Sequence, residues 1–289
     1  MRPDRITELA QKYVEYDMIS THTELPEFPV PRVRLLYTFL NDGGREASRS
    51  AETCALAAFL VQLGLDTHDL VDVEDSRKEE REMRSRQLKV LAGDYFSGVF
   101  YELLAQKAEI GTISKMSAAI CEVNRLKVRL YTGLRKMLLP AEEYLKECVQ
   151  LKTALFHSFT GQLDKSVQNI WKLLLAEISR CEVMLEEMKR YSLSPEEHRG
   201  FAYLHIWETG TAEDKEMISA RRIGEREWSL LLSKYKIREL LASMLRQSVE
   251  RVQSLVPECN GDKIRSEITG ILEPMQSVLS MQRRAIQEG

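Results

Sequence analysis

Apolar residues recur at helical spacing over most of this chain, and this periodicity limits its fold more than any other feature. One stripe alternates steps of four and three residues over three heptads: Val167, Trp171, Leu174, Ile178, Cys181, Leu185 and Met188. Such a stripe is typical of coiled-coil-like packing within a bundle, and it indicates a core helix rather than a cofactor site. Neither strand alternation nor a nucleotide-binding glycine-rich loop occurs in the sequence. The pattern therefore predicts an all-α helical bundle.

Prolines, glycines and caps divide this predicted bundle into segments. We expect one domain over 1–289, with N-terminal helices and a proline-rich connector in 1–45, a core in 46–165 and C-terminal helices in 166–289. The connector is expected to be extended because it contains three prolines. Thr53 to Leu65 is apolar nearly all round, which predicts a buried helix. Further predicted features are a helix over Ile6 to Ile19, a helix starting at the Ser194–Glu197 capping box, a boundary at Gly210, and helices over Trp228 to Val256 and Lys263 to Gln287.

Composition excludes several classes of partner. The 289 residues are 44% hydrophobic and 29% charged, and the net charge of −3 is spread without a basic patch, so no nucleic-acid partner is expected. Five scattered cysteines favour a reducing compartment, which predicts a cytoplasmic location. The first sixteen residues lack the apolar core of a signal peptide. The longest apolar run, Cys54 to Val61, is far shorter than the ~20 residues of a membrane span, so at most peripheral membrane contact is expected.

The stretch from Leu63 to Ala105 carries the most specific motifs. It has the pattern of a helix end, a polar loop and a second helix. The loop contains His68, Asp69, Leu70, Val71 and Asp72, followed by Arg77, Lys78 and Glu79. The second helix contains the sequence VLAGDYFS at residues 90–97, and a further motif, LKTALF, at residues 151–156 includes Lys152 and Thr153.

These motifs resemble those of trans-prenyl diphosphate synthases over roughly residues 50 to 160. In that family a DDxxD loop holds Mg²⁺ on an allylic diphosphate, two arginines follow, and later helices carry LAGDYL and a diphosphate-binding Lys-Thr pair. Here His68 replaces the first aspartate, and Arg77 and Lys78 stand where the arginines would be. The combination is most similar to the small subunit, component 1, of two-component heptaprenyl or hexaprenyl diphosphate synthases.

The metal-binding motifs are degraded in this chain. Ionising an allylic diphosphate needs two carboxylate clusters that hold several Mg²⁺ ions. The first cluster is reduced to Asp69 and Asp72, because His68 is a poor ligand for a hard cation. For the second, the nearest acidic group is Glu213, Asp214 and Glu216, with Met217 in place of the last aspartate. We therefore expect no metal or cofactor on this chain, and Mg²⁺ on a partner subunit.

Cationic side chains could still bind a diphosphate weakly. The resemblance assigns this role to Lys152 with Thr153, and to Arg77 and Lys78. The alternative is that Arg77 and Lys78 belong to a solvated charged face between residues 75 and 86, and that Lys152 only extends its ammonium group to water from an apolar helix.

The resemblance also implies a partner, component 2, whose intact motifs add isopentenyl units to farnesyl diphosphate for the menaquinone side chain. In homodimeric relatives the helix corresponding to Leu88 to Ala105 lies at the subunit interface. We assign an interface or tunnel role to Gly93, Asp94, Tyr95, Phe96 and Phe100. For the two phenylalanines a place in the core is the alternative. Gly93 and Gly98 suggest a close helix contact or ligand approach, because glycine is costly inside a helix.

Under this hypothesis the chain is a regulatory or structural subunit that supplies no catalytic residue, and a homodimer of the chain alone is a further option. Two other hypotheses remain open at this point. One is an autonomous Mg²⁺-dependent prenyl or terpene synthase that uses Asp69 and Asp72 with carboxylates not recognised downstream. The other is an unrelated helical adaptor, which leaves the joint presence of GDYFSG and LKTALF unexplained.

Overall fold

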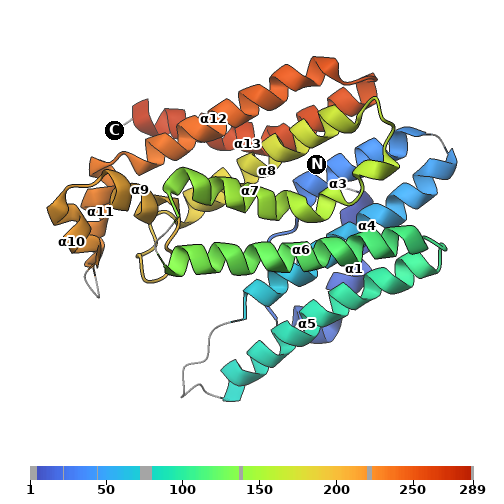
Figure 1. The fold of residues 1–289 in the computed structure, drawn as a ribbon, viewed down its shortest axis with the longest axis horizontal. Coiled ribbons are helices and arrows are strands. Elements are labelled where there is room, and N and C mark those ends of the chain that lie inside the picture. The colour runs from blue at the N-terminus through green and yellow to red at the C-terminus, as the bar shows by residue number, and fades with distance from the viewer. Residues whose placement is uncertain are drawn as a thin grey trace. The chain divides into compact units, whose positions relative to one another are not determined.

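A computed structural model describes residues 5–21, 23–43, 45–71, 80–136, 139–219 and 223–287, and every regular element in those ranges is helical (Figure 1). The prediction of an all-α fold is confirmed. The helices group into two compact units, Met1–Ala119 with Leu155–Gln168, and Ile120–Ala154 with Asn169–Gly289. The single domain over 1–289 and its three segments stay predictions.

The first unit is built around one buried helix. Its elements are α1 (Arg5–Val14), α2 (Asp17–Ser20), α3 (Val30–Leu40), η1 (Asn41–Gly43), α4 (Arg45–Asp69), α5 (Glu80–Ala105), the start of α6 (Ile110–Arg135), the end of α7 (Ala141–His157) and η2 (Thr160–Gln162). Residues 54 to 65 of α4 are all buried, which confirms the helix predicted there. In the described chain α4 makes its most extensive contact with α5, and Figure 1 draws the two side by side.

Small residues allow α4 and α5 to approach closely. A Cβ added to Gly64 would lie 2.5 Å from Ser97 Oγ and 2.8 Å from the carbonyl oxygen of Gly93. Any larger residue at position 64 would therefore push the two backbones apart. The close contact expected at Gly93 is confirmed, and it fixes the spacing of the two helices.

The second unit contains the remaining helices. Besides parts of α6 and α7, it contains α8 (Gln168–Arg190), α9 (Phe201–Thr209), α10 (Ala212–Ser219), α11 (Glu225–Lys234), α12 (Ile237–Leu255), η3 (Val256–Glu258) and α13 (Asp262–Gln287). Four residues of the predicted stripe on α8 are fully buried, which confirms that it is a core helix: Trp171, Leu174, Ile178 and Cys181.

Several predicted boundaries differ from the structure. The N-terminal helix is broken after Val14, and α3 starts at Val30 because Pro31 is acceptable in a first turn, where its missing N–H would have no helical partner. The helix expected from Trp228 to Val256 is broken at Tyr235 and Lys236, where Lys236 adopts a left-handed φ of 51°.

The capping box at Ser194 forms without a helix behind it. The amide and hydroxyl of Ser194 both donate to Glu197 Oε2, at 3.1 and 3.0 Å, but the segment is a turn. Helix α9 begins only at Phe201, after Gly200. The prediction of a helix start at Ser194 was wrong, because cap hydrogen bonds can close a turn without propagating it.

Candidate functional site

The described part of the degenerate metal motif lies at the C-terminal end of α4. His68 is half-buried and Asp69 is exposed in the last turn, whereas Asp72, Arg77 and Lys78 lie outside the described residues. Lys89 of α5 donates to the carbonyl oxygen of Leu70 at 3.2 Å, which closes the end of the helix.

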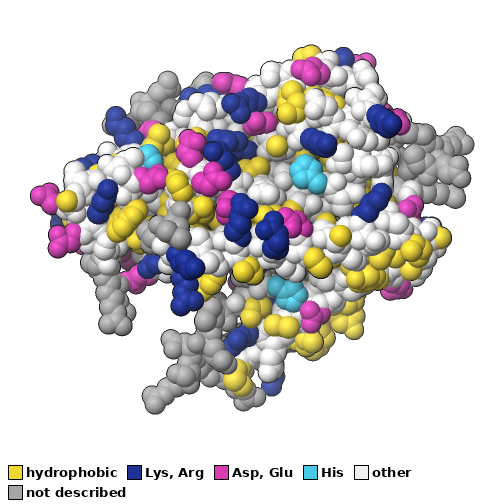
Figure 2. Space-filling view, in the orientation of Figure 1, with side chains coloured by type: hydrophobic (Ala, Val, Ile, Leu, Met, Phe, Trp, Pro, Cys, Tyr) yellow, Lys and Arg dark blue, Asp and Glu magenta, His cyan; other side chains and the backbone are white. Residues whose placement is uncertain are grey.

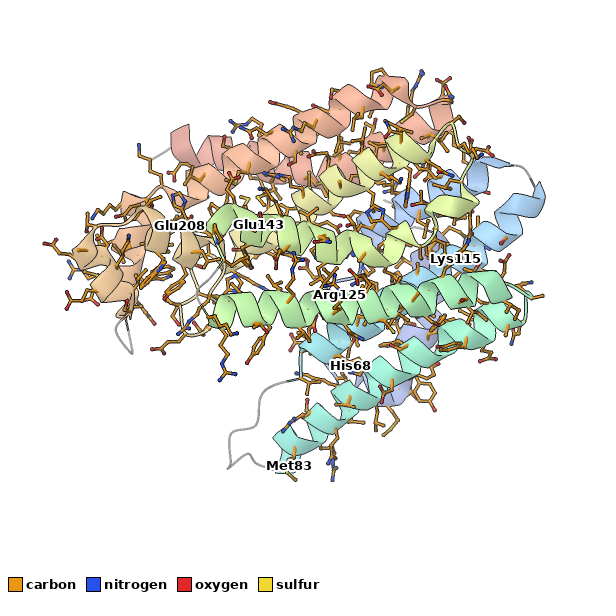
Figure 3. The ribbon with its side chains drawn as sticks, viewed as in Figure 1. His68, Met83, Lys115, Arg125, Glu143 and Glu208 are labelled. Atoms are coloured by element: carbon orange, nitrogen blue, oxygen red, sulfur yellow. The ribbon has the colours of Figure 1, made fainter. Side chains whose placement is uncertain are left out.

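The His68 ring lies against α5, and Figure 3 labels this residue at the end of α4. Its Nε2 lies 3.3 Å from Asp94 Oδ1, and the ring covers Gly93 so closely that a Cβ there would lie 2.7 Å from it. Mg²⁺ prefers carboxylate oxygens and water, so an imidazole engaged in this way does not fit a Mg²⁺ site. Among the residues that the structure describes, no three His, Cys, Asp or Glu side chains group as metal ligands.

The residues assigned to an interface or tunnel on α5 divide into two sets. Gly93 is buried, and Phe96 and Phe100 are 0% and 1% exposed, so both rings pack inside the first unit. Asp94 and Tyr95 are exposed. Burial favours the core alternative for the two phenylalanines, and their role in a product tunnel stays a prediction.

The other side of α5 forms an exposed face. We call this the α5 face, and it consists of Leu91, Asp94, Tyr95, Gly98, Tyr101 and Glu102. Leu91, Tyr95 and Tyr101 are 61%, 39% and 48% exposed, and the ring of Tyr16, which lies between α1 and α2, is 6.2 Å from that of Tyr95. Figure 2 shows hydrophobic side chains gathered over the region where Figure 1 draws α5. Sequence analysis assigned Asp94 and Tyr95 of this face to an interface or tunnel, and it did not identify Leu91, Tyr101 and Glu102.

In the second unit α7 carries the Lys-Thr pair. Lys152 Nζ lies 2.6 Å from Glu186 Oε1 on α8, so its charge is matched within the unit. Thr153 is buried, and its hydroxyl donates to the carbonyl oxygen of Gln150 at 3.1 Å. Diphosphate binding by this pair stays a prediction.

A buried carboxylate lies next to Glu186. Glu187 accepts hydrogen bonds from Tyr144 Oη at 2.7 Å, His198 Nε2 at 3.1 Å and the amide of Phe201 at 2.8 Å. Burial alone would raise the pKa of Glu187, but the hydrogen bonds from His198, Tyr144 and Phe201 lower it below its usual value. The carboxylate thus joins α7, α8 and the start of α9.

One cysteine of α7, Cys148, lies close to Glu187 and Tyr144. Burial raises the pKa of the Cys148 thiol to about 12 and that of Tyr144 well above its usual value. The nucleophilic form of a cysteine is its thiolate, and the raised pKa keeps Cys148 in the thiol form at neutral pH. Sequence analysis missed Glu187. The signal available was its position three residues after Met184 on the buried side of α8.

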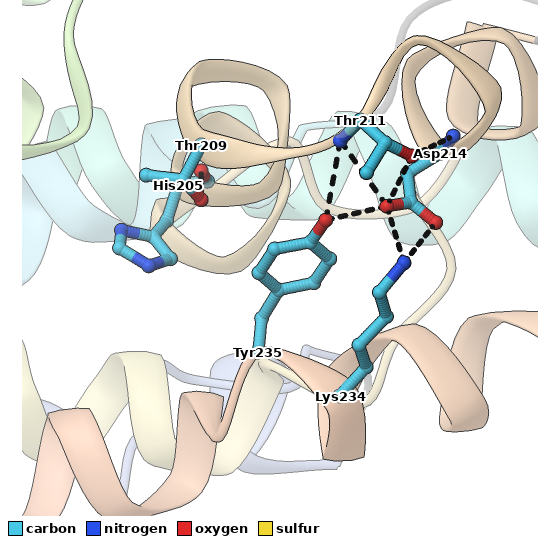
Figure 4. Close-up of polar contacts among 6 residues, drawn as sticks. All are labelled: His205, Thr209, Thr211, Asp214, Lys234 and Tyr235. Carbon is cyan, nitrogen blue, oxygen red and sulfur yellow. Dashed lines mark hydrogen bonds and ion pairs between the residues drawn. The ribbon is translucent and has the colours of Figure 1, made fainter.

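The second acidic group contains a buried carboxylate, Asp214, with a structural role. We call its contacts with Thr211, Lys234 and Tyr235 the Asp214 clamp (Figure 4). Thr211 caps α10, and Asp214 Oδ2 accepts hydrogen bonds from the Thr211 hydroxyl at 2.8 Å and Tyr235 Oη at 2.5 Å. Lys234 Nζ lies 2.6 and 2.9 Å from the two carboxylate oxygens. The hydrogen bonds from Lys234, Tyr235 and Thr211 hold the pKa of Asp214 far below its usual range. Since Glu213 and Glu216 are exposed, Asp214 alone of this group turns inward.

The fold is that of the all-α isoprenoid synthases. A heptaprenyl diphosphate synthase from Staphylococcus aureus superposes with a TM-score of 0.67 over 95% of this chain and 98% of that chain, at 14% identity. A geranylgeranyl pyrophosphate synthase from Corynebacterium glutamicum gives 0.70 over 95% and 90%, at 12% identity. At such identities the likeness establishes the fold alone.

Comparison of the sequence with known families establishes the family of the chain. The family described as heptaprenyl diphosphate synthase (HEPPP synthase) subunit 1 matches residues 16–221, and the chain belongs to this family. Heptaprenyl diphosphate synthase component 1 from Geobacillus stearothermophilus is 44% identical over 90 residues, a match that covers 31% of this chain and 39% of that relative. In the described part of the chain, no helix has both the length and the apolar character needed to cross a bilayer.

Proposed function

We propose that the chain is a non-catalytic subunit of a heptaprenyl or hexaprenyl diphosphate synthase and needs a second, catalytic subunit for prenyl transfer. The observation that carries this proposal is that three described side chains at the suspected catalytic positions are paired within the chain. His68 contacts Asp94, Lys152 contacts Glu186, and Asp214 contacts Lys234. These described residues leave no carboxylate cluster for a metal–diphosphate complex, whose charge would need several of them.

The catalytic chemistry then belongs to component 2, which carries Mg²⁺, farnesyl diphosphate and isopentenyl diphosphate. This chain supports the conformation of its partner and influences product length, and the product serves as a menaquinone side chain. The proposed setting is the cytoplasm, in keeping with five cysteines that form no disulfide bond. The family match supports this proposal over an unrelated helical adaptor.

The α5 face is the proposed docking surface for component 2. Aromatic and large apolar residues are enriched where protein partners bind, and the exposed Leu91, Tyr95 and Tyr101 meet this description. Tyr16 extends the face from the neighbouring N-terminal segment. The description of the family as subunit 1 supports a second subunit as the occupant.

The test is reconstitution from purified components. The chain alone, with Mg²⁺, farnesyl diphosphate and isopentenyl diphosphate, is expected to make no long-chain product, and adding component 2 is expected to restore synthesis. Steady turnover by the chain alone that is abolished by Asp69→Ala would show an autonomous synthase instead. If the chain forms no complex with component 2, the proposed heterodimer is contradicted.

A further inference from the structure

Gly98 lies in the interior of α5, and no contact with the described residues requires a glycine at this position. Glycine is less favourable inside a helix than any residue except proline. Gly64 and Gly93 have a reason to be glycine, because an added Cβ would meet Ser97 or His68. Within the described residues a Cβ on Gly98 would meet nothing within 4 Å. The space above Gly98 is therefore open to a group from outside the described residues.

Four exposed side chains surround Gly98 on the helix surface. Residues three and four positions away are the neighbours of a helical residue, and here they are Asp94, Tyr95, Tyr101 and Glu102. Side chains on a helix lean toward its N-terminus, so Tyr101 and Glu102 lean over Gly98. We call this the Gly98 socket, with a backbone floor and a rim of two carboxylates and two phenol rings.

The rim is held in place by contacts within the first unit. Asp94 Oδ1 lies 3.3 Å from His68 Nε2, and Tyr101 Oη lies 3.2 Å from the Ser117 hydroxyl on α6. Gln106 Nε2 donates to Glu102 Oε1 at 3.0 Å. Since these contacts exist in the chain alone, the socket is formed before any partner arrives.

We propose that the Gly98 socket receives an arginine side chain from a helix of the catalytic subunit, an inference that rests on the proposed function. A guanidinium group donates to carboxylates in its plane and stacks on aromatic rings with its faces, which matches this rim. Its long apolar stem can lie along a floor that lacks a Cβ. An apolar side chain would instead desolvate Asp94 and Glu102 without supplying a new cation to either carboxylate.

The first experiment fills the socket. The affinity of purified Gly98→Leu chain for purified component 2 is compared with that of wild type and of Gly133→Ala, which changes a glycine inside α6. We expect at least a tenfold loss for Gly98→Leu and no change for the control. Thermal melting of each variant shows that it is folded, and Gly98→Ala serves as a smaller filler. Unchanged affinity of both Gly98 variants in a complex that wild type forms would overturn the socket.

The second experiment identifies the occupant by charge. Glu102→Gln is expected to weaken the complex several-fold and reduce its salt dependence, whereas Asp164→Asn, a matched change elsewhere in the first unit, is not. An arginine-to-lysine scan of component 2 is expected to find one position whose effect vanishes in the Glu102→Gln background. Loss of binding by Gly98→Leu with no effect of Glu102→Gln would assign the socket to an apolar side chain and overturn the arginine.

Two further outcomes separate the competing explanations. If wild-type chain forms no complex with component 2, the proposed function fails, whatever the socket variants do. If the chain alone forms a dimer in sedimentation that Gly98→Leu disrupts, the occupant is a second copy of this chain, and the proposal of a catalytic-subunit arginine is overturned.

Discussion

Adding one methyl group at Gly93 should have an effect that depends on His68. Alanine in a helix interior is favoured over glycine by about 1 kcal/mol. At position 93, however, the new Cβ would lie 2.7 Å from the His68 ring, well inside van der Waals contact. Overfilling a packed site typically costs about 1 to 3 kcal/mol.

Gly93→Ala is therefore expected to lower the free energy of unfolding by about 0 to 2 kcal/mol, from these opposing terms. In a His68→Ala background the ring is absent, so the same change should raise it by about 1 kcal/mol. The difference is a coupling of roughly 1 to 3 kcal/mol between the two positions. Urea denaturation of the four proteins measures it.

Additive effects of Gly93→Ala and His68→Ala on the free energy of unfolding would refute this reasoning. If Gly93→Ala stabilises the chain equally with and without His68, the ring does not lie against Gly93, and the closeness of α4 and α5 at this point is wrong. Gly98→Ala is the matched control on the same helix. It should stabilise the isolated chain by about 1 kcal/mol in both backgrounds, because nothing in the described chain meets its Cβ.

Four other substitutions test the remaining features. Phe96→Ala and Phe100→Ala should each lower stability by about 3 to 5 kcal/mol because the rings are buried, and a longer product from an intact complex would instead place the ring at a tunnel. Glu187→Gln should destabilise by about 1 to 3 kcal/mol at pH 7. Because the pKa of Glu187 is lowered on folding, this difference should shrink as pH falls below its ordinary value of 4.5, and a pH-independent difference would contradict the cluster. Lys234→Met should lower the melting temperature by leaving Asp214 without its cation, and an unchanged melting curve would show that the clamp is not needed.

Local sequence patterns were sufficient to predict the core helices. The all-round apolar segment in α4 and the stripe on α8 are properties of neighbouring residues, so sequence periodicity finds them. The same periodicity places Phe96 and Tyr95 on adjacent sides of α5 but does not say which side faces the core. That choice depends on the packing of α4 against Gly93, which no local rule contains.

The polar clusters were beyond sequence analysis for a related reason. Glu187 is satisfied by Tyr144, 43 positions away, and by His198, 11 positions away. Asp214 depends on Lys234 and Tyr235 at the break between α11 and α12, where a lysine with positive φ gives no turn signal. The boundary predicted at Gly210 is a local feature, because Thr211 caps α10 and its partner Asp214 is three residues away.

The contact between α4 and α5 also bears on the kinetics of assembly. Gly64 and Gly93 allow the two long helices to pack closely against each other. Helix α5 is therefore supported by a helix that is itself buried. A surface supported in this way has little conformational freedom to lose when a partner arrives, which lowers the entropic cost of association. Encounter should then be limited by diffusion and orientation rather than by folding of the interface, so differences in affinity among variants of the α5 face should arise mainly from their dissociation rates.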